Sequence, residues 1–132
     1  YAAFVHDTFM QPDSGTSRAD FPGGSSEELW DSLQAILALP GNTRLFIGHD
    51  YGAEGRDEPE WEARVDDHKA HNIHVGGDTD KATYVETRDS RDATLALPDR
   101  MLAVLQINLR GGRLPDAESD GAHYLKLPVD KF

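Results

Sequence analysis

Apolar and polar positions follow one another along this chain in a pattern that predicts strands and helices in succession. Residues 1–5 (YAAFV) are apolar and predict a first strand, and residues 43–47 (TRLFI) predict a second, nearly continuous apolar strand. Between them, Ser25 is a suitable N-cap for an amphipathic helix that ends before Pro40. Its apolar positions recur at helical spacing: Leu29, Leu33, Ile36 and Leu37. This strand–helix–strand order predicts an α/β fold with a covered sheet.

The remainder of the chain is expected to be mainly helical. Three further helices are predicted, over residues 60–72, 79–88 and 101–109. Residues 11–24 and 52–59 contain glycine, proline and aspartate in turn patterns and are expected to be loops. The tail around residues 124–127 is expected to be either a terminal strand or an extended arm. No linker long enough to separate domains interrupts the pattern, so residues 1–132 are expected to form part of a single domain.

Charge and composition limit the functions to be considered. The 132 residues carry a formal net charge of −11, which argues against a nucleic-acid partner and against an anionic membrane surface. The chain has no cysteine, so thiolate metal sites, disulfides and a cysteine nucleophile are excluded within it. No apolar run is long enough to span a membrane and no signal peptide is visible. These features favour a cytoplasmic protein, and the missing initiator methionine favours a fragment or a processed chain.

Two residues at predicted strand ends could carry chemistry. Asp7 follows the first strand and His49 follows the second, where sites of layered α/β proteins collect. A carboxylate and an imidazole are suitable ligands for a divalent metal ion, although two ligands alone do not make a catalytic site. The alternative is an aspartate in a turn and a hydrogen-bonded histidine. His6 is expected to point to the opposite face of its strand, in a structural or supporting role.

Other polar residues admit two interpretations each. Arg18 could clamp a carboxylate or thiolate substrate or form an ion pair with Asp20. Tyr51 could offer its hydroxyl group to a ligand or simply pack its ring. Three histidines at helical spacing, near the end of the predicted 60–72 helix, resemble a metal-binding face: His68, His71 and His74. Their charged neighbours favour a solvated helix instead.

Taken together, the motifs resemble those of a known superfamily. HDT at residues 6–8, SRADF at 17–21, GHDY at 48–51 and NLR at 108–110 occur at the spacing found in the C-terminal half of metallo-β-lactamase-fold proteins. The resemblance covers nearly the whole chain. It is strongest for the persulfide dioxygenase and glyoxalase II branch, especially the bacterial beta-lactamase hydrolase-like group. It implies the C-terminal half of a four-layer αββα fold, with the HxHxDH motif of the family lying outside this sequence.

The resemblance also implies roles for single residues. Asp7 matches the carboxylate that ligates, and can bridge, the metals of this superfamily, and His49 matches a late histidine that ligates the second metal of dinuclear hydrolases. Arg18 and Tyr51 match positions that hold glutathione in the persulfide dioxygenase branch. Residues 14–18 (SGTSR) replace the Gly-Cys-Gly-Arg loop typical of that branch, which puts the identity of the thiol carrier in question.

Three functions follow as hypotheses. The first is oxidation of a low-molecular-weight persulfide to sulfite with O₂ and one Fe(II), with Asp7 as the ligand from this segment. The second is thioester or lactone hydrolysis with two Zn(II), in which Asp7 and His49 both ligate. The third is a half-domain that binds no metal alone and acts as an interaction module. The expected partners are a thiol-derived small molecule, the N-terminal half of the same fold and, in a homodimer, a second copy of the chain. The 132 residues alone are expected to be inactive.

Overall fold

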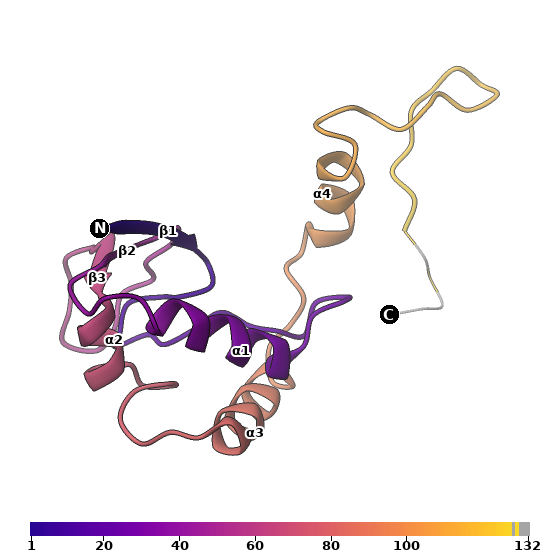
Figure 1. The fold of residues 1–132 in the computed structure, drawn as a ribbon. Helices are drawn as coiled ribbons and strands as arrows, with labels where there is room; N and C mark the ends of the chain where they lie inside the picture. Colours follow the sequence, from indigo (N-terminus) through magenta and orange to yellow (C-terminus); the bar gives the residue numbers. More distant parts are fainter. Residues whose placement is uncertain (128, 130–132) are drawn as a thin grey trace. The chain divides into compact units, whose positions relative to one another are not determined.

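The computed structural model describes residues 1–127 and 129. The chain divides into two units, Tyr1–Thr94 and Leu95–Phe132, and each is described by itself. The elements of the first unit are β1 (Ala2–His6), α1 (Ser26–Leu37), β2 (Arg44–Ile47), β3 (Glu62–Arg64), α2 (Val65–His71) and α3 (Lys81–Asp92) (Figure 1). The second unit contains α4 (Met101–Asn108). The assignment of the whole chain to one domain stays a prediction.

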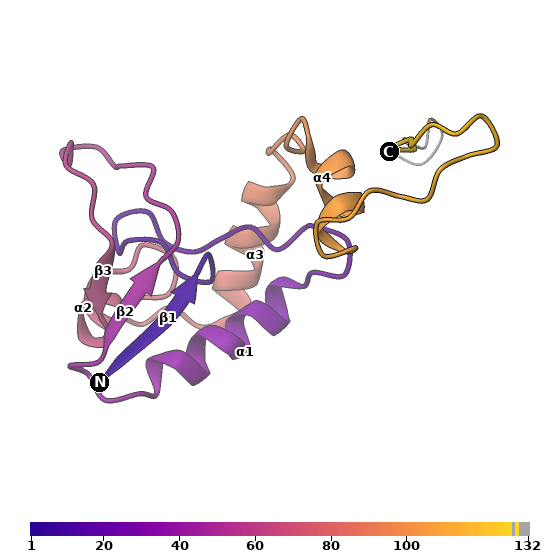
Figure 2. The same ribbon diagram turned by 90° about the horizontal axis from the view of Figure 1, so that it is seen from above.

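The first unit is built on a small mixed sheet with the strand order β1-β2-β3 (Figure 2). β1 pairs with β2 in parallel because α1 connects them as a crossover, and β3 pairs with β2 in antiparallel orientation. Phe4 lies opposite Phe46, but the register shifts between Phe4 and His6, so the end of β1 does not continue the regular ladder. This irregularity lies where the candidate chemistry begins.

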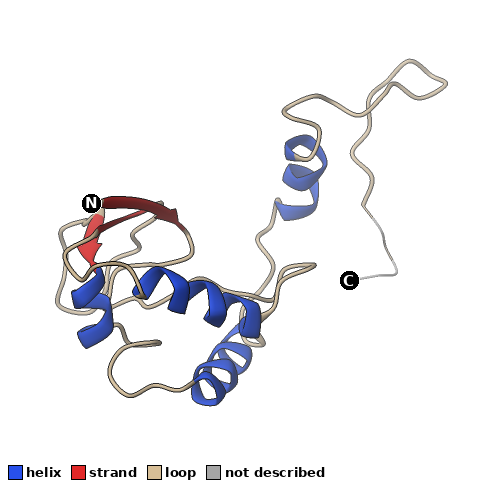
Figure 3. Cartoon of the chain, in the orientation of Figure 1, coloured by secondary structure: helices blue, strands red, loops and turns tan. Residues whose placement is uncertain are grey.

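Helices of the first unit lie on one side of the sheet (Figure 3). The buried core between them consists of Val5, Phe9, Leu33, Leu37, Leu45, Val65, Val75 and Tyr84. α1 presents Leu33 and Leu37 to this core, and Ser25 caps it by accepting a hydrogen bond from the Glu28 backbone N–H, as the sequence predicted. On the other side of the sheet, Phe4 is 86% exposed. The predicted α/β class is confirmed.

The helix predicted over residues 60–72 is wrong in its first part. Residues 62–64 form β3, and the helix α2 begins only at Val65. The Ile47 N–H donates to the Trp61 carbonyl, and the Val65 N–H donates to the Thr43 carbonyl. Pairing with the edge of β2 therefore decides the conformation of this segment and overrides its helical periodicity. α3 also lies later than predicted, because Asp80 caps its first turn and its buried face extends to Asp92.

The second unit confirms the last predicted helix within one residue, as α4. The following tail has no strand in its described part, so of the two predictions for residues 124–127 only the extended arm agrees with the structure. Gln106 of α4 fixes this arm through hydrogen bonds to both the N–H and the carbonyl of Lys126. Along residues 1–127 and 129, no helix combines the length and the apolar character required to cross a bilayer.

Candidate metal centre

The candidate centre begins with a tight turn at the end of β1. The Thr8 N–H donates to the Val5 carbonyl at 3.1 Å, which encloses His6 and Asp7 in the turn. His6 has a φ of 46°, in the left-handed region that residues other than glycine rarely adopt. A turn of this kind ends the alternation of side chains along the strand, so adjacent residues no longer point to opposite faces.

The turn brings His6 and Asp7 to the same place as His49, which follows β2. His6 Nδ1 lies 3.1 Å from Asp7 Oδ1, and His49 Nε2 lies 3.5 Å from the same oxygen. The two imidazole rings meet edge to face with their centroids 5.4 Å apart. The structure therefore brings together Asp7 and His49, which the sequence placed at two strand ends. The prediction that His6 points to the opposite face is wrong, because the register shift and the positive φ redirect it.

The three side chains fit a divalent metal ion. One ligand atom from each of them lies within 4.8 Å of the others. Asp7 Oδ1 is buried and has no hydrogen-bond partner among the described residues. A buried carboxylate oxygen without a donor is costly, and an ion would satisfy it. A carboxylate and two imidazoles are also the donor set that Zn(II) and Fe(II) accept in proteins. The metal role of Asp7 and His49 stays a prediction.

Gly48 allows the turn at the end of β1 and the segment after β2 to lie close together. A Cβ atom at this position would lie 2.7 Å from His6 Nδ1 and 2.7 Å from His6 Cε1. The Gly48 N–H donates to the His6 carbonyl at 3.2 Å, so backbone and side chain of His6 are both in contact with this glycine. The motif GHDY therefore places a glycine where the histidine ring of the neighbouring strand needs room.

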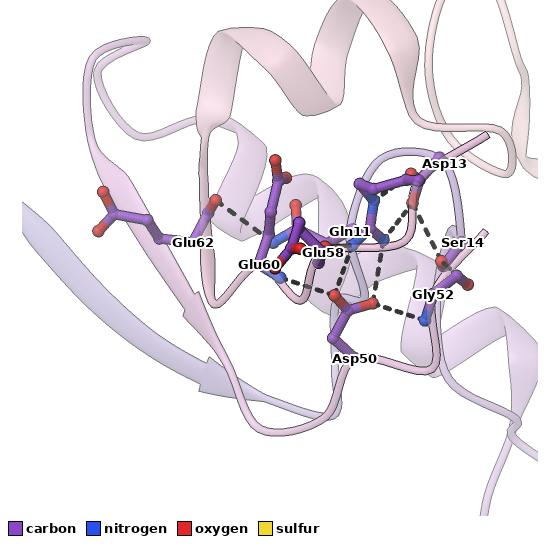
Figure 4. A network of polar contacts seen from close by, with 9 residues as sticks. Gln11, Asp13, Ser14, Asp50, Gly52, Glu58, Glu60 and Glu62 are labelled. Carbon is purple, nitrogen blue, oxygen red and sulfur yellow. Dashed lines mark hydrogen bonds and ion pairs between the residues drawn. The ribbon is translucent and has the colours of Figure 1, made fainter. Parts of the chain in front are cut away.

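The segment after His49 is fixed by an arginine that the sequence patterns did not reveal. Arg56 donates to both carboxylate oxygens of Asp50 and to both of Asp13. Asp50 also accepts hydrogen bonds from the N–H groups of Gly52 and Glu60, as Figure 4 shows. Arg56 and these N–H groups hold the pKa of Asp50 well below its usual value, and the two carboxylates raise the pKa of Arg56. The loop from 50 to 60 is thereby held by a charged network.

Tyr51, a predicted substrate-binding residue, lies next to His49. Its ring stacks on the His49 ring with a centroid distance of 6.0 Å, and 80% of the residue is exposed. The ring therefore packs on His49, while most of its surface remains accessible. A role for the Tyr51 hydroxyl group in substrate binding stays a prediction.

Arg18 makes the ion pair that was one of its two predicted alternatives. Its Nε and Nη2 atoms each lie 2.6 Å from an Asp20 carboxylate oxygen, and its guanidinium lies over the Phe21 ring. The pair raises the pKa of Arg18 and lowers the pKa of Asp20, mainly through these hydrogen bonds. This contact orients the guanidinium; binding of a substrate by Arg18 stays a prediction.

The loop that carries Arg18 is anchored by a buried ion pair on α3. Arg88 Nε donates to Asp92 Oδ1 at 2.9 Å, and Arg88 Nη1 donates to the Thr16 carbonyl at 3.0 Å. Asp92 Oδ2 accepts from the Ala19 N–H at 2.7 Å. Sequence reasoning missed this pair; the i,i+4 spacing of an arginine and an aspartate was the available signal, but it usually marks an exposed helix face.

The histidines of α2 and its following turn do not converge on one site. His68 is fully buried, packs against Phe9 and contacts the Asn72 side chain through Nδ1, whereas His71 is exposed. His74 Nδ1 accepts a hydrogen bond from the Thr16 N–H. Burial lowers the pKa of both His68 and His74 to about 4. The three histidines therefore do not form a shared metal-binding face, but the expected solvated helix face holds only for His71, because His68 faces the core.

Comparisons with known proteins agree with this fold. The chain is 56% identical over 129 residues to the "Beta-lactamase hydrolase-like protein" of Agrobacterium fabrum, covering 98% of this chain and 30% of that protein. It is 37% identical to "Glyoxylase B2" of Dictyostelium discoideum, covering 98% of this chain and 44% of that protein. The chain thus spans less than half the length of these relatives. No protein-family model matches it.

The fold is shared with a solved crystal structure. The crystal structure of ETHE1 from Myxococcus xanthus matches with a TM-score of 0.71 and 26% identity, over 85% of this chain and 45% of that chain. The chain therefore has the fold of part of a metallo-β-lactamase-type protein, and the predicted class is confirmed. The more particular resemblance, to the branch with beta-lactamase hydrolase-like, glyoxalase and ETHE1 proteins, is confirmed as well.

Proposed function

We propose that this segment belongs to a metal-dependent enzyme that, in its complete form, oxidises a low-molecular-weight persulfide with O₂ to sulfite. The observation that carries the proposal is the convergence of Asp7 with two imidazoles at the ends of β1 and β2, around a carboxylate oxygen without a hydrogen-bond donor. The likeness to ETHE1 from Myxococcus xanthus over 85% of the chain supports it. Since the relatives are longer than this chain, the activity is proposed for the complete protein.

The residues of this segment would have distinct tasks in that reaction. Asp7 would bind the metal through the oxygen that lacks a donor, and His49 would lie beside it. An Fe(II) ion bound there would supply redox chemistry and open coordination positions. Tyr51, exposed next to His49, would contact the polar end of the substrate. Arg18, oriented by Asp20, would attract a carboxylate of the thiol carrier.

A hydrolase is the second candidate, because one distance favours it. His49 Nε2 lies 3.5 Å from Asp7 Oδ1, which suits a histidine that ligates a metal shared with this carboxylate. A relative is also named "Glyoxylase B2". In this alternative, two Zn(II) ions would lower the pKa of bound water for attack on a thioester.

The partners follow from the length of the relatives and remain part of the proposal. We propose that the rest of the fold supplies the additional metal ligands and packs on this segment, with a small thiol-derived molecule as substrate. A non-catalytic half-domain is the remaining possibility for the chain alone, and a homodimer is a further expectation.

Activity and metal content of the complete protein test these candidates together. Oxygen consumption with sulfite formation from glutathione persulfide, at one iron per chain, is expected. Hydrolysis of a glutathione thioester at two zinc ions per chain would favour the hydrolase. If the folded, metal-loaded protein showed neither activity, both enzyme proposals would be contradicted.

A further inference from the structure

We propose that Arg56 is a positioning residue for substrate binding: it holds Tyr51, and the wall of a cavity next to Tyr51, in place without touching the substrate itself. The inference rests on the proposed function, in which Tyr51 contacts the polar end of the substrate. It adds a residue for which neither the sequence motifs nor the resemblance implies a role. It concerns the segment after β2 rather than the metal ligands, so it applies whichever metal ion the complete protein binds.

Tyr51 is the middle residue of a tight turn that the Asp50 side chain closes. Asp50 Oδ1 accepts a hydrogen bond from the Gly52 N–H at 3.0 Å, which is the pattern of an Asx turn. Gly52 has a φ of 73°, in the left-handed region that glycine adopts readily. Because 80% of Tyr51 is exposed, burial of its ring does not fix its position. The place of the phenol group therefore depends on this turn.

Arg56 holds the carboxylate that closes the turn. Its Nη1 atom lies 2.5 Å from Asp50 Oδ2, and its Nη2 atom lies 3.0 Å from Asp50 Oδ1. The Glu60 N–H also donates to Asp50 Oδ2, at 2.8 Å (Figure 4). Only 7% of the Asp50 side chain is exposed. A charge with so little access to water is costly without its cation, so loss of Arg56 would turn the carboxylate toward solvent and open the turn.

The same guanidinium joins this turn to the loop that follows Asp7. Arg56 Nε lies 2.6 Å from Asp13 Oδ2, and Arg56 Nη2 lies 2.9 Å from Asp13 Oδ1. Ser14 adds a second link, because its hydroxyl group donates to the Gly52 carbonyl at 3.4 Å. One side chain thus connects the loops that follow β1 and β2. A lysine carries a single ammonium group on a flexible stem and does not reproduce this forked geometry with two carboxylates.

Arg56 also holds both sides of a cavity next to Tyr51. The cavity has a volume of about 240 Å³ and is lined by Asp50, Tyr51, Gly52, Asp57, Glu58 and Pro59. Arg56 Nη1 donates to the Glu58 carbonyl at 3.2 Å, so the arginine contacts the 57–59 segment as well as Asp50. The arginine therefore fixes the space in which the polar end of a substrate would meet the Tyr51 hydroxyl group.

Steady-state kinetics of the complete protein with glutathione persulfide test the inference. Arg56→Met should raise KM about 10- to 100-fold, since misplacing a binding group by about 1 Å costs up to about 100-fold. The value of kcat should change less than about 3-fold, and bound metal should not change, because the metal ligands and the reacting atoms are not touched. Arg56→Lys should recover part of the loss. Lys81→Met, which removes an exposed ion pair with Asp31, is the control and should keep the parental KM.

A double-mutant cycle shows whether Arg56 acts through Tyr51. The KM increase in Arg56→Met/Tyr51→Ala should lie well below the product of the two single increases, because both changes remove the same contact with the substrate. A purely structural role would reduce the folded fraction, and with it the apparent kcat, while KM stayed at the parental value. Parental KM in Arg56→Met, or a double variant in which the two increases multiply, would overturn the inference and leave the proposed function intact.

Failure of the proposed function gives a different pattern. If the complete protein hydrolyses a glutathione thioester instead, the same cycle is measured with the thioester. If it has neither activity, the proposed function fails, and calorimetric titration with S-methylglutathione, which requires no turnover, decides the inference. Binding that weakens about 10-fold or more in Arg56→Met would support it. Equal binding by both proteins, or no binding by the parent, would overturn it.

Discussion

Removal of Arg88 should reveal how strongly the loop that carries Arg18 depends on α3. Arg88 and Asp92 are each about 3% exposed, and they bind one another as well as the backbone of the 16–19 loop. Arg88→Met keeps the length of the side chain but leaves the Asp92 carboxylate buried without its cation. The Thr16 carbonyl loses its donor in the same step.

The expected cost follows from these contacts. Removing one partner of a buried ion pair typically costs about 3–5 kcal/mol. Asp92 keeps the hydrogen bond from the Ala19 N–H, so we expect a loss near the lower end, about 3 kcal/mol. In Arg88→Met/Asp92→Leu no charge remains buried, and the double variant should be more stable than either single variant, because apolar replacement of a whole buried pair is often nearly neutral.

Urea unfolding at pH 7 of the parent chain, Arg88→Met, Asp92→Leu and the double variant gives this double-mutant cycle directly. Amide exchange at Ala19 reports on the loop and should become faster in Arg88→Met. A loss below about 1 kcal/mol in Arg88→Met, or additive losses in the double variant, would refute the reasoning, since the pair would then contribute no more than an exposed one.

Three further changes test other parts of the structure. Burial lowers the pKa of both His68 and His74 to about 4, against about 6.5 in the unfolded chain, so the unfolded state binds more protons between these values. The free energy of unfolding should therefore fall by up to about 3 kcal/mol for each histidine as the pH drops from about 6.5 to about 4. Urea unfolding across this range checks it, and a flat profile would contradict it. Gly15→Ala should lower the free energy of unfolding by about 2 kcal/mol or more, because φ is 88° and the new Cβ would lie 2.1 Å from His74 Nδ1. Thermal unfolding measures this loss, and an unchanged midpoint would contradict it. Arg56→Met should release the 50–60 loop, seen as faster proteolysis there with little change elsewhere; equal cleavage rates would show that the network does not hold the loop.

The elements that sequence patterns predicted well are those decided by local signals. The cap at Ser25 and the apolar stripe of α1 identified that helix, and the apolar run after Pro40-Gly41 identified β2. β3 was missed because its conformation depends on pairing with β2, which lies 18 residues away at the Arg44–Glu62 contact. Pairing partners of this kind leave little trace in the periodicity of a short segment.

The candidate site was predicted in part for the same reason. Asp7 and His49 stood at strand ends, where chemistry is expected, and the structure brings them together. His6 was misplaced because strict alternation was assumed up to the end of β1, whereas the turn gives it a positive φ. The Arg88–Asp92 pair was missed because its i,i+4 spacing usually marks an exposed helix face. The further partners of Arg56 and Arg88, Asp13 and the Thr16 carbonyl, lie 43 and 72 residues away and leave no local signal.

Metal analysis of the complete protein and of its Asp7→Ala variant tests the central claim most directly. Both proteins would be purified in parallel, loaded with Fe(II) or Zn(II) and assayed for bound metal by elemental analysis, with His71→Gln as the control. The account predicts that Asp7→Ala loses bound metal while it remains folded, because the oxygen that binds the ion is removed. Unchanged metal content in folded Asp7→Ala would contradict the account.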